Sequence, residues 1–276
     1  FCLSRGLGDV YKRQFQDRLH LATKAFAYSV QYDAEILQYF QNLLSSDFPE
    51  TFVLTGTKIQ QNRYGENPHQ KSAWYKTSEK GCSSLTLLSG KELSYNNLLD
   101  IASAYQFLVD IPENYFCVII KHTNPTGAAV AENPEEAYQK ALKANEKSAF
   151  GGIVGMNAEI TLPLAEILSQ TFLEVLLAPS IQPDALDYLR KKKKNLRIVT
   201  GKISRDEAWQ VRSIPGGFLL QNPDILDDHP VNWQQVCGGF ISQEMMDDLY
   251  FAWRVVKNVK SNAVVLVKGK CTVGIG

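Results

Sequence analysis

The sequence predicts an α/β fold with a substantially parallel sheet. Phe116–Ile120 is a continuous apolar run of strand length, which is typical of a strand that is buried on both faces, and Leu173–Ala178 is also strand-like. Between these runs lie segments whose apolar residues recur at spacings of three and four, as in amphipathic helices. Strands that alternate with helices favour βαβ units and therefore a parallel arrangement.

The composition is that of an ordinary soluble protein of 276 residues, long enough for one or two domains of roughly 150 residues each. The 29 basic residues balance 29 acidic ones, which argues against a nucleic-acid binder. No stretch approaches the ~20 apolar residues of a membrane span. The five cysteines are scattered and form no CxxC pair, so we expect no disulfide framework and a reducing, cytoplasmic compartment.

The first part of the chain contains three predicted segments. Residues 1–14 have no clear period and no initiator methionine; they resemble a translated sequencing-adapter tail, and a disordered natural terminus is the alternative. From Leu19 the pattern is helical, and Asp33 is predicted to cap a second helix that carries Ile36, Phe40 and Leu44 on one face. The polar stretch Ser45–Tyr64 has the composition of a connection between two domains.

The remaining elements follow in chain order. The predicted strands are Phe116–Ile120, Gly152–Met156, Leu173–Ala178 and Leu196–Thr200. The predicted helices are Asn97–Val109, one that opens at Pro134, Leu162–Gln170, Pro183–Arg190, and one from Ser242 to about Lys260. Two further strands, Ala263–Lys268 and Cys271–Ile275, are predicted to form a hairpin.

The run of five basic residues at Arg190–Lys194 allows two interpretations. It lies at the carboxyl end of a predicted helix, where the helix dipole favours cations, so a solvated helix end is the main expectation. An RNA-binding patch is the alternative, and it predicts a salt-dependent RNA affinity.

Common catalytic motifs are absent from the sequence, which contains no GxGxxG, Walker A, HExxH or GxSxG pattern. The most informative polar cluster is Lys121–Gly127, which directly follows a predicted buried strand, where ligands of open α/β sheets often bind. His122 could take a proton near neutral pH, and Lys121 could stabilise negative charge on an oxygen. Asn-Pro and Gly predict a tight turn after them. A surface loop with incidental charges is the alternative.

Three further clusters are candidates for ligand binding. Arg63–Gln70 combines an arginine and an aromatic residue with turn-forming residues, which suits a phosphate-gripping or base-stacking loop. Ser148–Gly152 ends in paired glycines that permit close approach of a ligand to the backbone. Lys260–Asn262 ends a predicted helix. A polar linker turn, an ordinary turn into a strand and a helix cap are the respective alternatives.

Taken together, these strings resemble the signatures of a bifunctional purine-biosynthesis family. Its members carry 5-aminoimidazole-4-carboxamide ribonucleotide (AICAR) formyltransferase and IMP cyclohydrolase activities. Five matches in the same order carry the resemblance, which covers about residues 15–276. They are Arg63–Gln70, Leu93–Asn97, Lys121–Gly127, Ser148–Gly152, and Lys260–Asn262 together with Val273–Gly276.

The resemblance implies a division of the chain into parts. Residues 15–45 would be the C-terminal helices of a cyclohydrolase domain, 46–62 a linker, and 63–276 the N-terminal part of a formyltransferase domain with a cytidine-deaminase-like α/β architecture. The chain would then be an internal segment of a longer protein. The zinc-binding spacing of true deaminases is missing, so no metal is expected.

The resemblance also implies roles for eight residues. His122 resembles the general base that accepts a proton from the AICAR amine, and Lys121 resembles the group that stabilises the tetrahedral oxyanion. The implied nucleotide contacts are Arg63, Tyr64, Asn97, Gly151, Glu174 and Asn262, of which Glu174 has the loosest flanking match. The implied cosubstrate is 10-formyltetrahydrofolate, and the implied assembly is a homodimer. A catalytically inactive nucleotide-binding fragment is the alternative.

Overall fold

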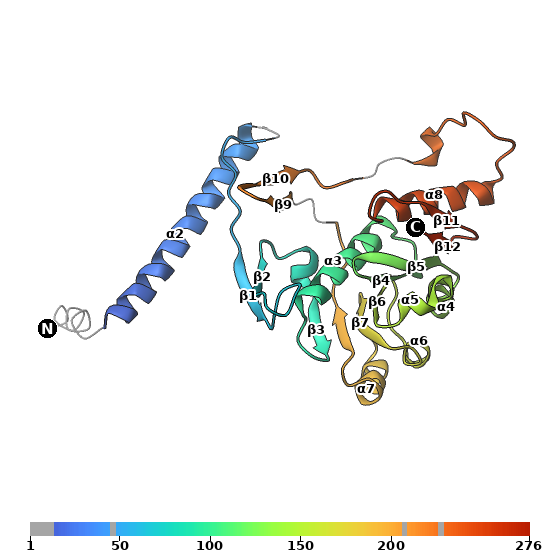
Figure 1. Cartoon of the computed structure of the whole chain (residues 1–276), viewed down its shortest axis with the longest axis horizontal. Helices are drawn as coiled ribbons and strands as arrows, with labels where there is room; N and C mark the ends of the chain where they lie inside the picture. The colour runs from blue at the N-terminus through green and yellow to red at the C-terminus, as the bar shows by residue number, and fades with distance from the viewer. Residues whose placement is uncertain (1–13, 45–47, 206–208, 226–228) are drawn as a thin grey trace. The chain divides into compact units, whose positions relative to one another are not determined.

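The computed structural model describes residues 14–44, 48–205, 209–225 and 229–276 (Figure 1). The chain divides into two compact units, and the boundary falls between Thr57 and Lys58. Most of the predicted non-native tail, residues 1–13, lies outside the described residues.

Within residues 14–44 of the first unit, the structure has one continuous helix, α2 (Phe15–Leu44), and not two. The predicted helix start at Asp33 is therefore wrong, because Asp33 lies within the continuous helix. No glycine or proline occurs between Phe15 and Leu44, and a single aspartate costs a helix interior only a few tenths of a kcal/mol (about 0.7 at most). Gln38 and Gln41 of α2 donate side-chain hydrogen bonds to the backbone carbonyls of Val53 and Thr51.

The second unit is built on a six-stranded sheet with the strand order β3-β8-β7-β6-β4-β5. The pairs β6–β7 and β7–β8 are parallel, whereas β3–β8, β4–β6 and β4–β5 are antiparallel. The sheet is therefore mixed, which corrects the expectation of a substantially parallel one. The strands are β3 (Thr86–Ser89), β4 (Phe116–Lys121), β5 (Asn124–Val130), β6 (Gly152–Met156), β7 (Leu173–Ala178) and β8 (Arg197–Thr200).

Helices cover both faces of this sheet, as can be followed in Figure 1. Side chains of strand β4 alternate between the faces: Cys117 and Ile119 belong to one core cluster, and Val118 and Ile120 to the other. The first cluster is closed by α4 (Pro134–Ala144), α5 (Glu146–Ala149), α6 (Leu162–Leu168) and α7 (Pro183–Lys192), and the second by α3 (Tyr95–Asp110) and α8 (Gln243–Lys257).

Polar side chains cap three of the helix starts. The side-chain oxygens of Ser94, Asn133 and Ser242 each accept a hydrogen bond from a backbone N–H in the first turn of α3, α4 and α8. The helices predicted for the second unit are present, with boundaries within a few residues of those expected. Helix α7 ends within the basic run at Lys192, which confirms that this run lies at a helix end.

Shorter elements surround the main sheet. Strands β11 (Val265–Val267) and β12 (Thr272–Ile275) form the predicted antiparallel hairpin. Two further pairs were not predicted: β1 (Thr57–Asn62) with β2 (Ser72–Lys76), and β9 (Gln210–Ile214) with β10 (Gly217–Gln221). Strand β1 lies within the stretch Ser45–Tyr64, which was expected to be only a polar connection. The 3₁₀ helices are η1 (Gly81–Ser84) and η2 (Pro230–Asn232).

Strand β5 replaces most of the predicted tight turn after Lys121. Asn124–Val130 pairs with β4, so only His122 and Thr123 remain in the connection. Pro125 lacks a backbone N–H, and it is tolerated because β5 is the last strand of the six-stranded sheet. The hairpin fixes the direction in which the chain leaves Lys121.

Alanine in place of Gly127 is expected to destabilise this hairpin strongly. A Cβ atom on Gly127 would lie 1.9 Å from the carbonyl oxygen of Ala141 and 3.0 Å from the Cβ of Ala144, both in helix α4. Since a backbone oxygen cannot give way without displacing the helix, the free energy of unfolding should fall by about 3 kcal/mol or more. Urea unfolding of this chain measures the change.

Gly217→Ala is the matched control for Gly127→Ala. Gly217 also lies in a strand, but a Cβ atom there would meet nothing within 4 Å. We expect this variant to change the free energy of unfolding by about 0.5 kcal/mol or less. Equal losses in the two variants would contradict the steric explanation.

Candidate active site

Several of the predicted polar clusters meet at one edge of the main sheet. Strand β4 is antiparallel to β6, and Ile120 pairs with Ile153, so Lys121 at the end of β4 lies beside the start of β6. The start of β7 follows next, because Gly152 pairs with Leu173. The cluster after β4 therefore lies at the carboxyl end of its own strand, as expected. The same edge holds the amino ends of the parallel strands.

The connection between β4 and β5 has an unusual backbone. His122 and Thr123 have φ angles of 54° and 63°, in the left-handed region that β-branched residues such as threonine rarely adopt. Helix α3 holds both sides of Thr123. The backbone N–H of Thr123 donates to Asp100 Oδ1 at 2.6 Å, and the carbonyl of Thr123 accepts from Ser103 Oγ at 3.0 Å. The exposed His122 is thus carried on a turn that two side chains of α3 fix.

Lys121 is held on the other side of this turn. Its Nζ donates a 2.6 Å hydrogen bond to the carbonyl oxygen of Phe150, which directly precedes Gly151. Gly151 has a φ of 72°, and its N–H donates to the carbonyl of Phe172 at 2.8 Å. The cluster Lys121–His122 and the cluster around Gly151 are therefore neighbours.

The loop Arg63–Gln70 is attached to the start of helix α3. The carbonyl of Tyr64 accepts a 2.8 Å hydrogen bond from Ser72 Oγ, and the carbonyl of Glu66 accepts a longer one, 3.4 Å, from Asn96 Nδ2. The loop closes on itself, since Gly65 N–H donates to the carbonyl of Gln70. This arrangement places Arg63 and Tyr64 near the amino end of the helix that carries Asp100.

Asn97 has a structural role in this arrangement. Its Oδ1 accepts from the N–H of Ser94 at 3.1 Å, and its own N–H donates to Ser94 Oγ at 3.1 Å. The two residues thus form a reciprocal capping box at the start of α3. Asn97 is buried, with 7% of its surface exposed. Its side chain orients the helix, and a direct ligand contact stays a prediction.

The segment Lys260–Asn262 is joined to the β4–β5 hairpin. The backbone N–H of Lys260 donates to Asn124 Oδ1 at 3.2 Å, directly after the His122–Thr123 turn. Asn262 follows Lys260 by two residues in the sequence, and its contact with a ligand stays a prediction. The structure therefore brings together clusters that are separated by more than 100 residues in the sequence.

Glu174 lies near the same edge, at the second position of β7, but its carboxylate is already engaged. Its Oε2 accepts a 2.8 Å hydrogen bond from Arg197, whose Nε also donates to the carbonyl of Glu92. This ion pair links β7 to β8 and gives Glu174 a structural role. A contact between Glu174 and a ligand stays a prediction.

Asp100 and Ser103 are the residues of this edge that sequence reasoning missed. Burial raises the pKa of the Asp100 carboxyl above its usual 3.8, and the backbone amides of Thr123 and His122 and the charges of His122 and Lys260 oppose the rise. Asn97, Asp100 and Ser103 follow one another at intervals of three on a predicted helix, and this polar row was the available signal.

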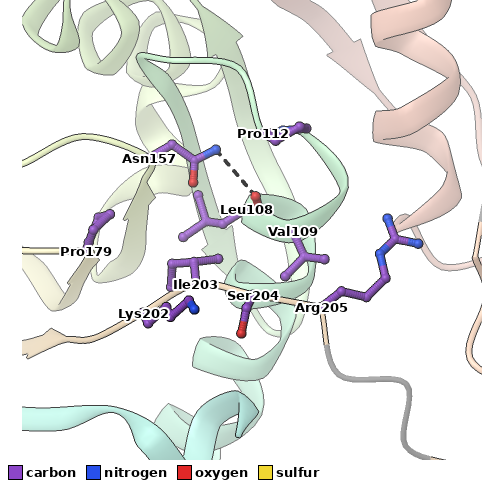
Figure 2. A pocket seen from close by; sticks show the side chains of 9 residues that line it. All are labelled: Leu108, Val109, Pro112, Asn157, Pro179, Lys202, Ile203, Ser204 and Arg205. Carbon is purple, nitrogen blue, oxygen red and sulfur yellow. Dashed lines mark hydrogen bonds between the residues drawn. The ribbon is translucent and has the colours of Figure 1, made fainter.

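The cavity drawn in Figure 2 lies elsewhere, at the carboxyl ends of the parallel strands. It has a volume of about 380 Å³ and is lined by residues that follow β6, β7 and β8, namely Asn157, Pro179 and Lys202. Asn157 Nδ2 donates to the carbonyl of Ile111 at 2.6 Å and so fixes the end of α3. None of the eight residues predicted for the site lines this cavity.

In residues 14–44, 48–205, 209–225 and 229–276, no group of three or more His, Cys, Asp or Glu side chains is placed to hold a metal ion. Within the same ranges, no helix has the length and apolar character that crossing a membrane requires.

The fold and these side chains define an α/β domain with a polar site at one edge of a mixed sheet. A flexible ammonium group and an imidazole lie on adjacent residues, beside a glycine that allows close approach and near an arginine-bearing loop. These groups suit proton transfer and the stabilisation of negative charge on a small polar substrate.

Residues 7–276 match the family described as the AICARFT/IMPCHase bienzyme, and the chain belongs to this family. It is 43% identical over 263 residues to the bifunctional purine biosynthesis protein PurH of Thermoanaerobacter sp. strain X514, covering 95% of this chain and 51% of that protein. The PurH proteins of a Cyanothece strain and of Persephonella marina are 41% and 42% identical, over 94% and 95% of this chain. The chain spans about half the length of these curated relatives.

Proposed function

We propose that this chain supplies the nucleotide side of an active site that transfers a formyl group from 10-formyltetrahydrofolate to the 5-amino group of AICAR, in purine biosynthesis. The observation that carries the proposal is the pair Lys121–His122 on a fixed turn beside Gly151. Membership of the bienzyme family supports the substrate assignment.

The proposed step needs both side chains of the pair. The AICAR amine is a weak nucleophile because its lone pair is delocalised into the ring and the carboxamide. His122 accepts the proton that the amine loses when its nitrogen attacks the formyl carbon. Lys121 stabilises the oxyanion that forms on the formyl oxygen, and its Nζ donates to the neighbouring carbonyl of Phe150. When the intermediate collapses, the bond between the formyl carbon and N10 of the folate breaks, N10 takes up a proton, and tetrahydrofolate leaves.

Six further residues are proposed as AICAR contacts: Arg63, Tyr64, Asn97, Gly151, Glu174 and Asn262. Arg63 and Tyr64 suit the phosphate and ribose, since a guanidinium group binds phosphate with two parallel hydrogen bonds. Asn97 would bind through the amide atoms that its capping box leaves free, and Glu174 would share its carboxylate with Arg197.

We also propose the domain assignment implied by the family. Residues 15–45 form the C-terminal end of an IMP cyclohydrolase domain, 46–62 a linker, and 63–276 the first part of a formyltransferase domain. The boundary between the two compact units, which falls inside the proposed linker, supports this division. The mixed sheet with helices on both faces is compatible with a cytidine-deaminase-like architecture. The complete protein is proposed to be a cytoplasmic homodimer with both activities.

AICAR is expected to bind to this chain, and Arg63→Ala is expected to weaken the binding. A hydrogen bond to a charged group contributes about 1.5–3 kcal/mol, so the dissociation constant should rise by about 10–100-fold. Isothermal titration calorimetry with AICAR measures it. The control is Lys191→Ala in the exposed basic run on α7, which should bind AICAR as the unaltered chain does.

Two results would contradict the proposal. The first is a chain that does not bind AICAR, and the second is an Arg63→Ala variant with unchanged affinity. RNA binding at low salt that Lys191→Ala weakens would instead favour the basic run as the functional surface. Because the chain spans half of its relatives, we expect slow or no formyl transfer by the chain alone. The protein from the complete reading frame around it should perform the transfer.

A further inference from the structure

The best-defined feature outside the assigned roles is the support beneath the His122–Thr123 turn. Two consecutive residues other than glycine hold left-handed φ angles there, each at a cost of about 1–3 kcal/mol. Such a conformation persists only where the surrounding structure determines it. The pairing of β5 with β4 brings the chain back at Asn124, but it leaves the two peptide groups of the turn without partners in the sheet.

Helix α3 supplies those partners. Asp100 Oδ1 accepts from the N–H of Thr123 at 2.6 Å, the short distance expected for a charged acceptor. Ser103 Oγ, one turn further along the helix, donates to the carbonyl of the same residue at 3.0 Å. The capping box of Ser94 and Asn97 fixes the start of α3 three residues before Asp100, so the helix is a rigid support.

We infer that Asp100 is a positioning residue for His122: its carboxylate holds the left-handed turn that presents the imidazole, and it does so from a helix that a separate capping box orients. This inference rests on the proposed function, because it concerns the same site. The carboxylate of Asp100 contacts the backbone of the turn and needs no contact with AICAR. Loss of this carboxylate should therefore affect the rate of transfer more than the binding of AICAR.

Helix α3 carries an aspartate, Asp100, in its interior. The side chain of Asp100 is half-buried, and burial of a carboxylate costs free energy unless hydrogen bonds compensate for the lost water. Here the compensation comes from backbone amides of the turn. The helix and the turn therefore stabilise each other.

The test compares three substitutions in the protein expressed from the complete reading frame that contains this chain. Asp100→Ala removes the acceptor, and kcat for formyl transfer should fall about 10–100-fold, with KM for AICAR within about threefold. Asp100→Asn keeps an oxygen acceptor at the same position, so kcat should return to within about fivefold of the unaltered protein. Ser103→Ala removes the weaker contact, and kcat should fall about 3–10-fold.

A second measurement on this chain follows the turn itself. Amide hydrogen exchange of Thr123, observed by NMR, should accelerate at least about tenfold in Asp100→Ala and stay slow in Asp100→Asn. Leu99→Ala, at an exposed position on the same helix, is the control for general effects on α3 and should alter neither kcat nor the exchange of Thr123.

The possible outcomes separate this inference from the proposed function. An unaltered protein that transfers no formyl group contradicts the proposed function and removes the basis of the inference. An active protein whose Asp100→Ala variant keeps its kcat, or whose loss appears only in KM for AICAR, overturns the inference alone. An Asp100→Asn variant as slow as Asp100→Ala overturns it as well, since the acceptor would then not be what matters.

Discussion

Replacement of His122 is expected to lower kcat for formyl transfer by about 10²–10⁴-fold, with AICAR affinity changed only a few-fold. The expected loss corresponds to the contribution of a well-placed general base. The imidazole is exposed at the tip of the β4–β5 turn, so its removal leaves no cavity in the core. The substrate should therefore still bind, while the proton of its amine has no acceptor.

The choice of substitution matters because of the backbone of His122. Its φ of 54° is one that asparagine adopts more readily than alanine does. His122→Ala removes the base and adds strain to the turn, whereas His122→Asn removes the base and preserves the preference for this conformation. If proton transfer is the main role, both variants should be slow, and His122→Asn should have a melting temperature close to that of the unaltered protein.

Steady-state kinetics of the protein from the complete reading frame, with calorimetry for AICAR binding, tests this expectation. His20→Ala, at an exposed position of helix α2, is the control for removing a histidine as such and should leave kcat unchanged. Near-normal turnover by His122→Asn would contradict the general-base role. A large loss in His122→Ala alone would show that the strain of the turn is the cause.

Much of the main sheet could be predicted because its strands are marked by local patterns. Phe116–Ile120 is an uninterrupted apolar run, and Leu173–Ala178 is apolar except for Glu174; such runs arise when both faces of a strand are covered. Helix α3 could be placed from its amphipathic pattern, α4 from Pro134 in its first turn, and α8 from Ser242 at its start.

The direction of the strands could not be predicted in the same way. A buried strand has the same apolar pattern whether its neighbour is parallel or antiparallel, so the antiparallel pairing of β4 with β6 left no local signal. Strand β5 could not be predicted from the sequence for a different reason. Asn124, Pro125 and Gly127 are turn-forming residues by local preference, and only the position of β5 at the end of the sheet makes them acceptable in a strand.

The sequence could predict which residue types form the candidate site. It could not predict the hydrogen bonds from α3 that hold the turn in place. Lys121 and His122 stand out because two chemically useful side chains directly follow a buried strand. Asp100 lies more than 20 residues earlier, and its role depends on a backbone contact with Thr123 that no sequence pattern encodes. For Glu174, the sequence predicted a ligand contact, but the structure shows its carboxylate in an ion pair with Arg197. A ligand would have to compete with this ion pair.

Lys121→Met is the second substitution with a large expected effect. Methionine retains an unbranched side chain of similar length and loses only the ammonium group, so the half-buried stem should still pack. Loss of a group that stabilises a developing oxyanion costs about 10²–10³ in kcat. We expect a loss of this size with little change in AICAR affinity, measured by the same kinetics and calorimetry. Lys143→Met, at an exposed position of α4, should behave as the unaltered protein.

The double variant Lys121→Met/His122→Asn tests whether the two residues act in one step. If the ammonium group stabilises the oxyanion that forms while the imidazole accepts the proton, each residue is effective only when the other is present. The loss in the double variant should then be well below the product of the two single losses, because coupled groups are not additive. Losses that multiply would indicate independent roles. A Lys121→Met variant with normal kcat would contradict the oxyanion role and leave the 2.6 Å contact with Phe150 as the only function of this lysine.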